Sequence, residues 1–222
     1  MGYNIAIDGP SGAGKSSLSR AAAEEIGFMY IDTGALYRTI GLYVYRNKIS
    51  AEDESAVASA LSDININIKF VDGCQHVFLN GSDVSEDIRI HEVSDYTSKV
   101  SAFACVREFL LRTQRELAEK YDVIMDGRDI GSVVLPDAEL KIYLTASAEE
   151  RAKRRFDELA AKGQDVKYET VLHDVIERDF RDMNRKTAPL KVADGAVVVD
   201  TTENTFKQSL KELTDIIKEK LK

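Results

Sequence analysis

The segment Gly9-Pro10-Ser11-Gly12-Ala13-Gly14-Lys15-Ser16 is the strongest indication of the fold, because it matches G-x-x-x-x-G-K-[ST] at every fixed position. Glycines let backbone N–H groups turn inward around a polyphosphate, and a following helix presents its positive end to the anion. Lys15 can reach the β- and γ-phosphates, and the Ser16 hydroxyl can ligate Mg²⁺. The stretch therefore predicts a loop that binds ATP or GTP, but it does not identify a reaction.

The sequence around this loop alternates between short apolar runs and longer helical patterns. The predicted strands are residues 3–7, 28–31, 121–125, 140–144 and 196–199. Runs of this length are typical of strands buried on both faces of a parallel sheet. Helical patterns include Ser16–Ile26 and a closing amphipathic helix over Glu203–Lys222. We therefore predict an α/β fold of the P-loop NTPase type, with a mostly parallel five-stranded sheet flanked by helices.

Two stretches interrupt this alternation. Between about residues 47 and 88, an Ala/Ser/Glu-rich helix precedes strict alternation over Ile64–Ile68 and the apolar run Val77–Leu79. The turn pairs Asp72-Gly73 and Asn80-Gly81 complete the pattern of a small antiparallel sheet inserted between core units. The polar, charged stretch Arg154–Lys167 predicts a mobile flap between two helices.

Composition limits the classes of partner. The 222 residues are 44% hydrophobic and 31% charged, with a net charge of -8, which disfavours binding to duplex nucleic acid. No apolar run approaches the roughly 18 residues of a membrane span, and the start of the chain does not resemble a secretory signal. Cys74 and Cys105 lie far apart, so neither a disulfide framework nor a zinc site is expected. We expect a cytoplasmic protein with no membrane or nucleic-acid partner.

Two aspartates follow predicted strands. Asp126 closes the apolar run 123–125, where a second acid would help to orient Mg²⁺ and its waters. The alternative is a strand-end aspartate that only caps the next turn. Asp8 also follows a strand, and we interpret it as a residue that structures a loop.

Arginines separate a kinase from a regulatory GTPase. The sequence has no D-x-x-G, and Asn47-Lys48-Ile49-Ser50 lacks the acid of the guanine-reading N-K-x-D. Arg38 and Arg128 follow strands beside glycine-containing turns, where a planar guanidinium can bind phosphate oxygens in pairs. Two further groups are Arg151, Arg154 and Arg155 before the flap, and Arg178, Arg181 and Arg185, whose spacing predicts one helical face. We interpret Arg20, Arg46, Arg89, Arg112 and Arg115 as solvated surface residues.

Several segments, in order and spanning nearly the whole chain, resemble the bacterial cytidylate kinase family. They are residues 5–16, Asp32-Thr33-Gly34-Ala35-Leu36-Tyr37-Arg38, Asp126-Gly127-Arg128-Asp129-Ile130-Gly131, 177–185 and Ala188-Pro189-Leu190. The phosphate-binding loop alone is generic, whereas the second and third segments together are highly specific. The resemblance implies a core at about residues 1–36 and 100–222, a monophosphate-binding insert at about 37–99 and a lid at about 154–167.

The resemblance also implies a role for each residue of the site. The implied ATP contacts are Gly9, Pro10, Ser11, Gly12, Ala13, Gly14, Lys15, Ser16, Ser17 and Arg154. Tyr37, Arg38, Arg128 and Arg185 would hold the CMP phosphate, with Thr33 nearby, while Arg178 and Asp182 would reach the ribose. Ser98, Arg107 and Asp129 would read the base. Three arginines would belong to the lid and its base and close over the ATP phosphates, namely Arg151, Arg154 and Arg155. The catalytic set would be Lys15, Asp126, Arg128 and Arg185, with Mg²⁺ on Ser16 and, through water, on Asp126.

The implied reaction transfers the γ-phosphoryl group of ATP in line to CMP or dCMP, as part of pyrimidine nucleotide metabolism. It needs no covalent intermediate and no general base, because the acceptor phosphate is already ionised near neutral pH. A monomer is expected, because the site needs no second chain. Two alternatives remain open: a P-loop kinase for another acceptor such as UMP, AMP or shikimate, and a non-catalytic nucleotide-sensing module.

Overall fold

A five-stranded sheet forms the centre of the molecule. The computed structural model describes residues 2–71, 74–161 and 163–222. The strand order is β2-β6-β1-β7-β8, and every pairing is parallel. These strands are Asn4–Asp8 (β1), Met29–Asp32 (β2), Val123–Gly127 (β6), Leu140–Thr145 (β7) and Val197–Asp200 (β8). Each predicted strand is thus confirmed to within two residues at either end, and so is the parallel sheet.

Helices cover both faces of this sheet. On one face, α1 (Lys15–Ile26) and α8 (Phe206–Lys220) pack their apolar side chains against the isoleucines of β1. On the other face, α5 (Ala104–Lys120) packs against Val123 and Met125 of β6. Both predicted helices are confirmed, although α8 begins at residue 206 instead of 203, where Thr205 and Gln208 form a capping box.

The insert has a sheet and a core of its own. The antiparallel strands Ile66–Val71 (β3), Cys74–Leu79 (β4) and Ser82–Asp83 (β5) pair in that order. The first two of these strands share one hydrophobic cluster with Thr33–Arg46 (α2), Glu54–Ala60 (α3), His91–Val100 (α4) and the start of α5. The predicted antiparallel element is therefore present. The predicted turn Asp72-Gly73 and the side chain of Cys74 lie outside the described residues.

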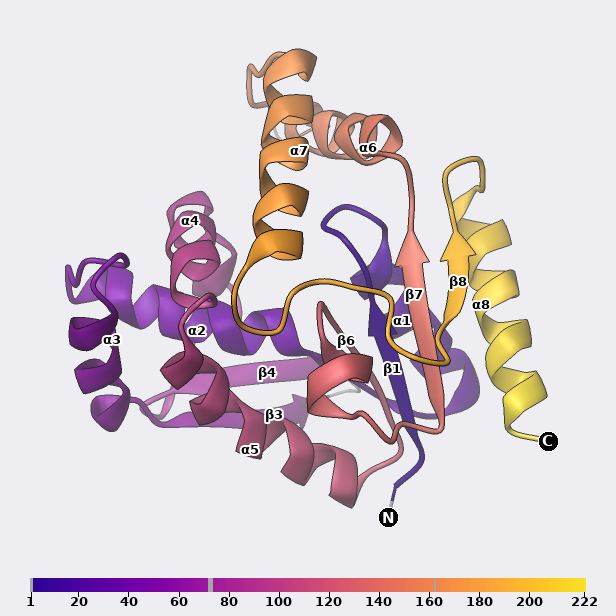
Figure 1. Cartoon of the computed structure of the whole chain (residues 1–222), viewed down its shortest axis with the longest axis horizontal. Coiled ribbons are helices and arrows are strands. Elements are labelled where there is room, and N and C mark those ends of the chain that lie inside the picture. Colours follow the sequence, from indigo (N-terminus) through magenta and orange to yellow (C-terminus); the bar gives the residue numbers. More distant parts are fainter. Residues whose placement is uncertain (1, 72–73, 162) are drawn as a thin grey trace.

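The carboxyl ends of the strands meet at one edge of the sheet. The register aligns Asp32 of β2 with Asp126 of β6, and Asp8 of β1 with Gly127 of β6. Ala148–Ala161 (α6) and Tyr168–Asn184 (α7) lie beyond this edge, and in Figure 1 α7 stands over it between α4 and β7. Polar residues that follow the strands are thereby brought together under α7.

Three sequence-based expectations need correction. The stretch 154–161 is the helical end of α6 rather than a connection between two helices, so the described connection to α7 is only 163–167. α7 ends at Asn184, and Arg185 has an extended backbone, so Arg178, Arg181 and Arg185 do not share one helical face. β8 is an edge strand in which Val199 alone is buried, rather than a strand buried on both faces. In the described part of the chain, no helix is both long enough and apolar enough to cross a membrane.

Candidate active site

The loop between β1 and α1 has the backbone of a phosphate-binding cradle. Gly9, Gly12 and Gly14 have φ values of 150°, 79° and 84°, which L side chains rarely adopt. A Cβ atom at Gly9 would lie 1.9 Å from the carbonyl oxygen of Leu144, so this loop can pass β7 only as glycine. Helix α1 begins at Lys15 with neither a side-chain cap nor an acidic residue in its first turn. Its first N–H groups are therefore free to bind an anion that enters the loop.

A carboxylate, a lysine and two hydroxyls meet at the start of α1. Asp126 accepts a hydrogen bond from Ser16 Oγ on Oδ2 and another from the Tyr30 hydroxyl on Oδ1, each at 2.9 Å. Lys15 Nζ donates to the Pro10 carbonyl at 2.6 Å. Burial, reinforced by the charge of Asp32, raises the pKa of Asp126 to about 6. Burial also lowers the pKa of Lys15 well below its ordinary value, so an incoming phosphate would stabilise its charged form.

These oxygen atoms fit magnesium. Mg²⁺ prefers hard oxygen ligands and keeps several waters, so one or two protein oxygens beside a phosphate are sufficient. Ser16 Oγ and the Asp126 carboxylate supply such oxygens next to the loop. Within residues 2–71, 74–161 and 163–222, no group of three His, Cys, Asp or Glu side chains is arranged as a protein-only metal site.

Asp8 anchors the loop that follows β6. Its two carboxylate oxygens accept hydrogen bonds from the backbone N–H groups of Ile130 and Gly131, at 2.7 and 2.8 Å. Burial raises the pKa of Asp8 to about 6. The interpretation of Asp8 as a loop-structuring residue is confirmed, and the loop it holds includes Arg128 and Asp129.

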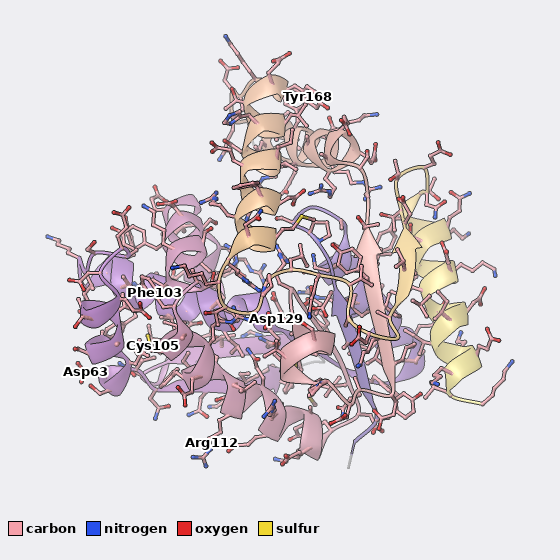
Figure 2. All side chains as sticks on the ribbon, in the orientation of Figure 1. Asp63, Phe103, Cys105, Arg112, Asp129 and Tyr168 are labelled. Carbon is pink, nitrogen blue, oxygen red and sulfur yellow. The ribbon has the colours of Figure 1, made fainter. Side chains whose placement is uncertain are left out.

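Arginines and aspartates alternate across the floor of the site. Arg128 Nε donates to Asp182 Oδ2 of α7 at 2.9 Å. Asp129 pairs with Arg107 of α5 through one carboxylate oxygen and with Arg185 through the other, at 3.3 Å from Arg185. Figure 2 shows Asp129 near the middle of the molecule, below the lower end of α7. Asp129 thus links α5 to the segment that follows α7.

Arg178 is half-buried and has unused hydrogen-bonding capacity. Its Nη1 lies 3.5 Å from Ser11 Oγ of the phosphate-binding loop. Among the residues that the structure describes, its buried Nε has no hydrogen-bond partner. Burial, and then the charge of Arg128, lower the pKa of Arg178 to about 10. A desolvated cation with a spare donor is suited to a polar, anionic ligand.

Helices α2 and α4 supply the opposite wall. Arg38 Nη1 donates to Ser94 Oγ of α4 at 3.0 Å. The Tyr37 ring lies beneath the guanidinium of Arg107, with 5.4 Å between the guanidinium carbon and the ring centroid. Thr33 Oγ1 donates to the Asp126 carbonyl at 2.7 Å, so this hydroxyl joins α2 to β6. Ser98 lines the same wall.

One cavity of about 1060 Å³ connects these groups. It is lined by most of the predicted site residues, namely Ser11, Gly12, Gly14, Lys15, Ser16, Ser17, Thr33, Tyr37, Arg38, Ser98, Arg107, Asp126, Arg128, Asp129, Arg154, Arg178, Asp182 and Arg185. The remaining three, Gly9, Pro10 and Ala13, belong to the loop but do not line the cavity, and Ala13 is fully buried. The volume exceeds what one small ligand needs, so two ligands can face each other in it.

The three arginines near the flap do not act alike. Arg154 lines the cavity, where it pairs with Glu150 at 2.9 Å and donates to the Thr201 carbonyl at 2.7 Å. Arg155 also lines the cavity. Arg151, by contrast, is buried and bonds Asp179 through both of its terminal nitrogens. The expectation that Arg151 helps to close over ATP phosphates therefore needs correction, because its donors are occupied within the protein.

Sequence reasoning gave no role in the site to several residues that line the cavity. They are Arg20, Asp32, Arg89, Ser94, Thr97, Ser101, Glu150, Glu158, Thr201, Asn204, Phe206 and Ser209. Arg20 and Arg89 are exposed, as expected, yet they lie at the rim. Ser94, Ser98 and Ser101 follow the i, i+4, i+7 spacing of one helical face, and this signal could have revealed the α4 wall.

The fold and the site together define the class of P-loop kinases. The protein as a whole is acidic, yet several arginines line the cavity that contains the phosphate-binding loop. These guanidinium groups can balance the negative charge of two phosphorylated groups. A solved structure of shikimate kinase from Bacteroides thetaiotaomicron has the same fold, with a TM-score of 0.51, 13% identity, and coverage of 97% of this chain and 98% of that one.

Sequence comparison gives the family. The sequence profile described as Cytidylate kinase matches residues 5–219. A cytidylate kinase of Caldicellulosiruptor bescii is 53% identical over 213 residues, which is 96% of this chain and 94% of that protein. Another, of Caldanaerobacter subterraneus subsp. tengcongensis, is 49% identical over 218 residues, which is 98% of this chain and 96% of that protein. The chain belongs to the cytidylate kinase family.

Proposed function

We propose that this chain is a phosphotransferase that moves the γ-phosphoryl group of ATP to CMP or dCMP, giving CDP or dCDP and ADP. Membership of the cytidylate kinase family supports this reaction. The observation that carries it is that a phosphate-binding loop faces Arg38, Arg128 and Arg185 across one and the same cavity. The donor ATP binds on residues 9–17 and Arg154, and the acceptor binds under α7 between α2 and α5.

The acceptor phosphate binds to a ring of guanidinium groups. Arg128 faces the cavity with its Nε on Asp182, and Arg185 is held beside it by Asp129. Tyr37 and Arg38 approach from α2, with Thr33 at the start of that helix. Arg178 and Asp182 bind the ribose, and the spare Nε of Arg178 supports this assignment. These groups place the acceptor oxygen in line with the donor phosphate and balance the charge of both.

Base recognition rests on Ser98, Arg107 and Asp129. Cytosine has an N4 amino donor and acceptors at N3 and O2, whereas uracil inverts the first two of these. Arg107 and Ser98 donate to the acceptors, and Asp129 accepts from N4. A base with the wrong pattern leaves buried polar groups without partners, which allows strong discrimination.

Catalysis on this chain consists of positioning and charge balance. Lys15 moves from the Pro10 carbonyl onto the donor phosphates, and Arg128 and Arg185 bind charge on the transferring group. Mg²⁺, held by Ser16 and through water by Asp126, would neutralise phosphate charge when bound. Closure of the lid, at about 154–167, over the donor phosphates excludes water and suppresses hydrolysis. The protein works as a cytoplasmic monomer, with no membrane or nucleic-acid partner.

The test is ADP release by the purified full-length chain with Mg-ATP and a panel of acceptors: CMP, dCMP, UMP, AMP, GMP and shikimate. We expect rapid turnover with CMP and dCMP, and turnover at least about tenfold slower with UMP. Lys15→Ala is the inactive control. Activity chiefly with another acceptor would keep the kinase class and overturn the base contacts. Silence across the panel with ATP still bound would favour a nucleotide-sensing module.

A further inference from the structure

A side chain of the insert bonds the edge of the central sheet. β2 is an edge strand, so the outer backbone groups of its last residue have no neighbouring strand within the described sheet. The carboxamide of Gln75, on β4, occupies that place. Asp32 N–H donates to Gln75 Oε1 at 2.9 Å, and Gln75 Nε2 donates to the Asp32 carbonyl at 3.2 Å. The amide therefore pairs with Asp32 as a peptide group of a further strand would.

Gln75 is a polar residue on an otherwise apolar face. Side chains of alternate residues on a strand point the same way, so Gln75, Val77 and Leu79 share one face of β4. Val77 and Leu79 are buried in the cluster that β4 forms with Leu36 and Ile40 of α2. The same face thus packs against α2 through its apolar members and bonds the residue before α2 through its amide.

Asp32 is the junction between the sheet and the acceptor wall. It ends β2 and caps α2, where its Oδ1 accepts from Ala35 N–H at 3.0 Å. On the other side of the junction, Thr33 Oγ1 bonds the Asp126 carbonyl of β6. Tyr37 and Arg38 lie one turn further along α2. The direction in which α2 leaves the sheet therefore depends on bonds made at residues 32 and 33.

We propose that Gln75 is a positioning residue for the acceptor phosphate: its amide fixes Asp32, and thereby sets where α2 places Tyr37 and Arg38 relative to Lys15. This inference rests on the proposed function for its assignment of Tyr37 and Arg38 to the acceptor. Its structural part, the bond from Gln75 to Asp32, stands independently of any activity. Gln75 touches no substrate and acts only through the junction.

The bond is tested by amide hydrogen exchange on the full-length chain. Gln75→Met keeps the length and most of the packing of the side chain and removes both hydrogen bonds. We expect the exchange of the Asp32 N–H to accelerate about tenfold or more, because this amide loses its acceptor. The matched control is Asn67→Ala, which removes an exposed carboxamide from β3 of the same sheet. Unchanged exchange at Asp32 in Gln75→Met would overturn the inference.

The functional part of the proposal is tested by comparing the change in the KM for CMP with the change in the Kd for ATP. We expect Gln75→Met to raise the KM for CMP about fivefold, while the Kd for ATP and the KM of Asn67→Ala stay at their wild-type values. Gln75→Glu keeps the acceptor for the Asp32 N–H but loses the donor to the Asp32 carbonyl. Its KM for CMP should lie between those of the wild-type chain and Gln75→Met, and its Asp32 N–H should stay protected from exchange. Accelerated exchange with an unchanged KM for CMP would overturn the positioning role. A wild-type chain inactive with CMP would contradict the proposed function, while exchange would still report on the bond.

Discussion

Two arginine–aspartate pairs join α7 to the rest of the molecule. They differ in how many N–H donors of the arginine already have a partner within the protein. Arg151 bonds Asp179 through Nη1 and Nη2, Ser11 O through Nη1 and Ala146 O through Nε, and its side chain is 5% exposed. Arg128 bonds Asp182 through Nε, and its Nη1 lies 3.4 Å from the Gly127 carbonyl, with 22% of the side chain exposed to the cavity. The two aspartates are only three residues apart on α7.

The difference shows that a pair of residue types does not determine a role. Arg151 is saturated within the protein, so it ties α7 and the phosphate-binding loop together and has little to offer a ligand. Arg128 makes a single strong bond, which orients the guanidinium while leaving donors toward the cavity. Removing one partner from a buried pair of the first kind destabilises the fold, because the other charge stays buried without a partner. A pair of the second kind leaves N–H donors free to bind a ligand.

Arg128→Ala should produce the largest effect. Loss of a cation at the acceptor phosphate should lower kcat/KM for CMP by about 10³-fold or more, while ATP binding stays near its wild-type value. Steady-state kinetics together with calorimetric titration of ATP check this. A variant that turns over normally would contradict the role assigned to Arg128.

Arg151→Met should instead affect stability. Removal of one partner leaves the carboxylate of Asp179 poorly solvated, so we expect the free energy of unfolding to fall by about 3–5 kcal/mol. Urea unfolding measures it. The double variant Arg151→Met/Asp179→Leu should recover part of the loss, because no unpaired charge remains. A double variant no more stable than the single one would show that the carboxylate is not the source of the cost.

Substitution of Asp8, which holds the loop that contains Arg128, should have a smaller effect on stability, and this effect should depend on pH. The pKa of Asp8 is raised to about 6 in the folded chain, so between about pH 4 and 6 the folded chain keeps a proton that the unfolded chain has released. This group therefore lowers the free energy of unfolding as the pH rises through that window, and Asp126, also about 6, acts in the same direction. Between pH 4.5 and 6.5, the free energy of unfolding should fall by about 2 kcal/mol less in Asp8→Asn than in the wild-type chain. Urea unfolding at each pH measures this. The prediction is contradicted if the free energy of unfolding changes with pH by the same amount in both proteins.

An exposed pair should do least of all. Arg112 and Glu116 form an i, i+4 pair on α5 at 2.6 Å, and Figure 2 shows Arg112 projecting outward, away from Asp129. Solvent screens such a pair. Arg112→Ala should leave both the midpoint of urea unfolding and the kinetics with CMP within experimental scatter. A clear shift in either would mean that burial does not separate the three kinds of pair.

Local patterns predicted much of this molecule. Five apolar runs gave the five strands, and the glycine and lysine spacing gave the cradle and the start of α1. Both are properties of neighbouring residues, set by periodicity and by allowed backbone angles. The prediction was wrong where residues adjacent in the sequence carry little information about structure. Arg151 was grouped with Arg154, and Arg185 was placed on a helix that ends at Asn184. The end of that helix and the partner of that arginine depend on segments far away in the chain.

The class of chemistry can be read from the amino-acid sequence, because a phosphate-binding loop, its lysine and its serine must be contiguous to work. Which arginine meets which carboxylate, by contrast, depends on how the chain folds. Asp129 joins Arg107 to Arg185, and Gln75 bonds Asp32 from 43 residues away. Hydrogen bonds are short and directional, so their partners are fixed only when packing brings distant segments within about 3 Å. Packing is a property of the whole chain rather than of any stretch within it.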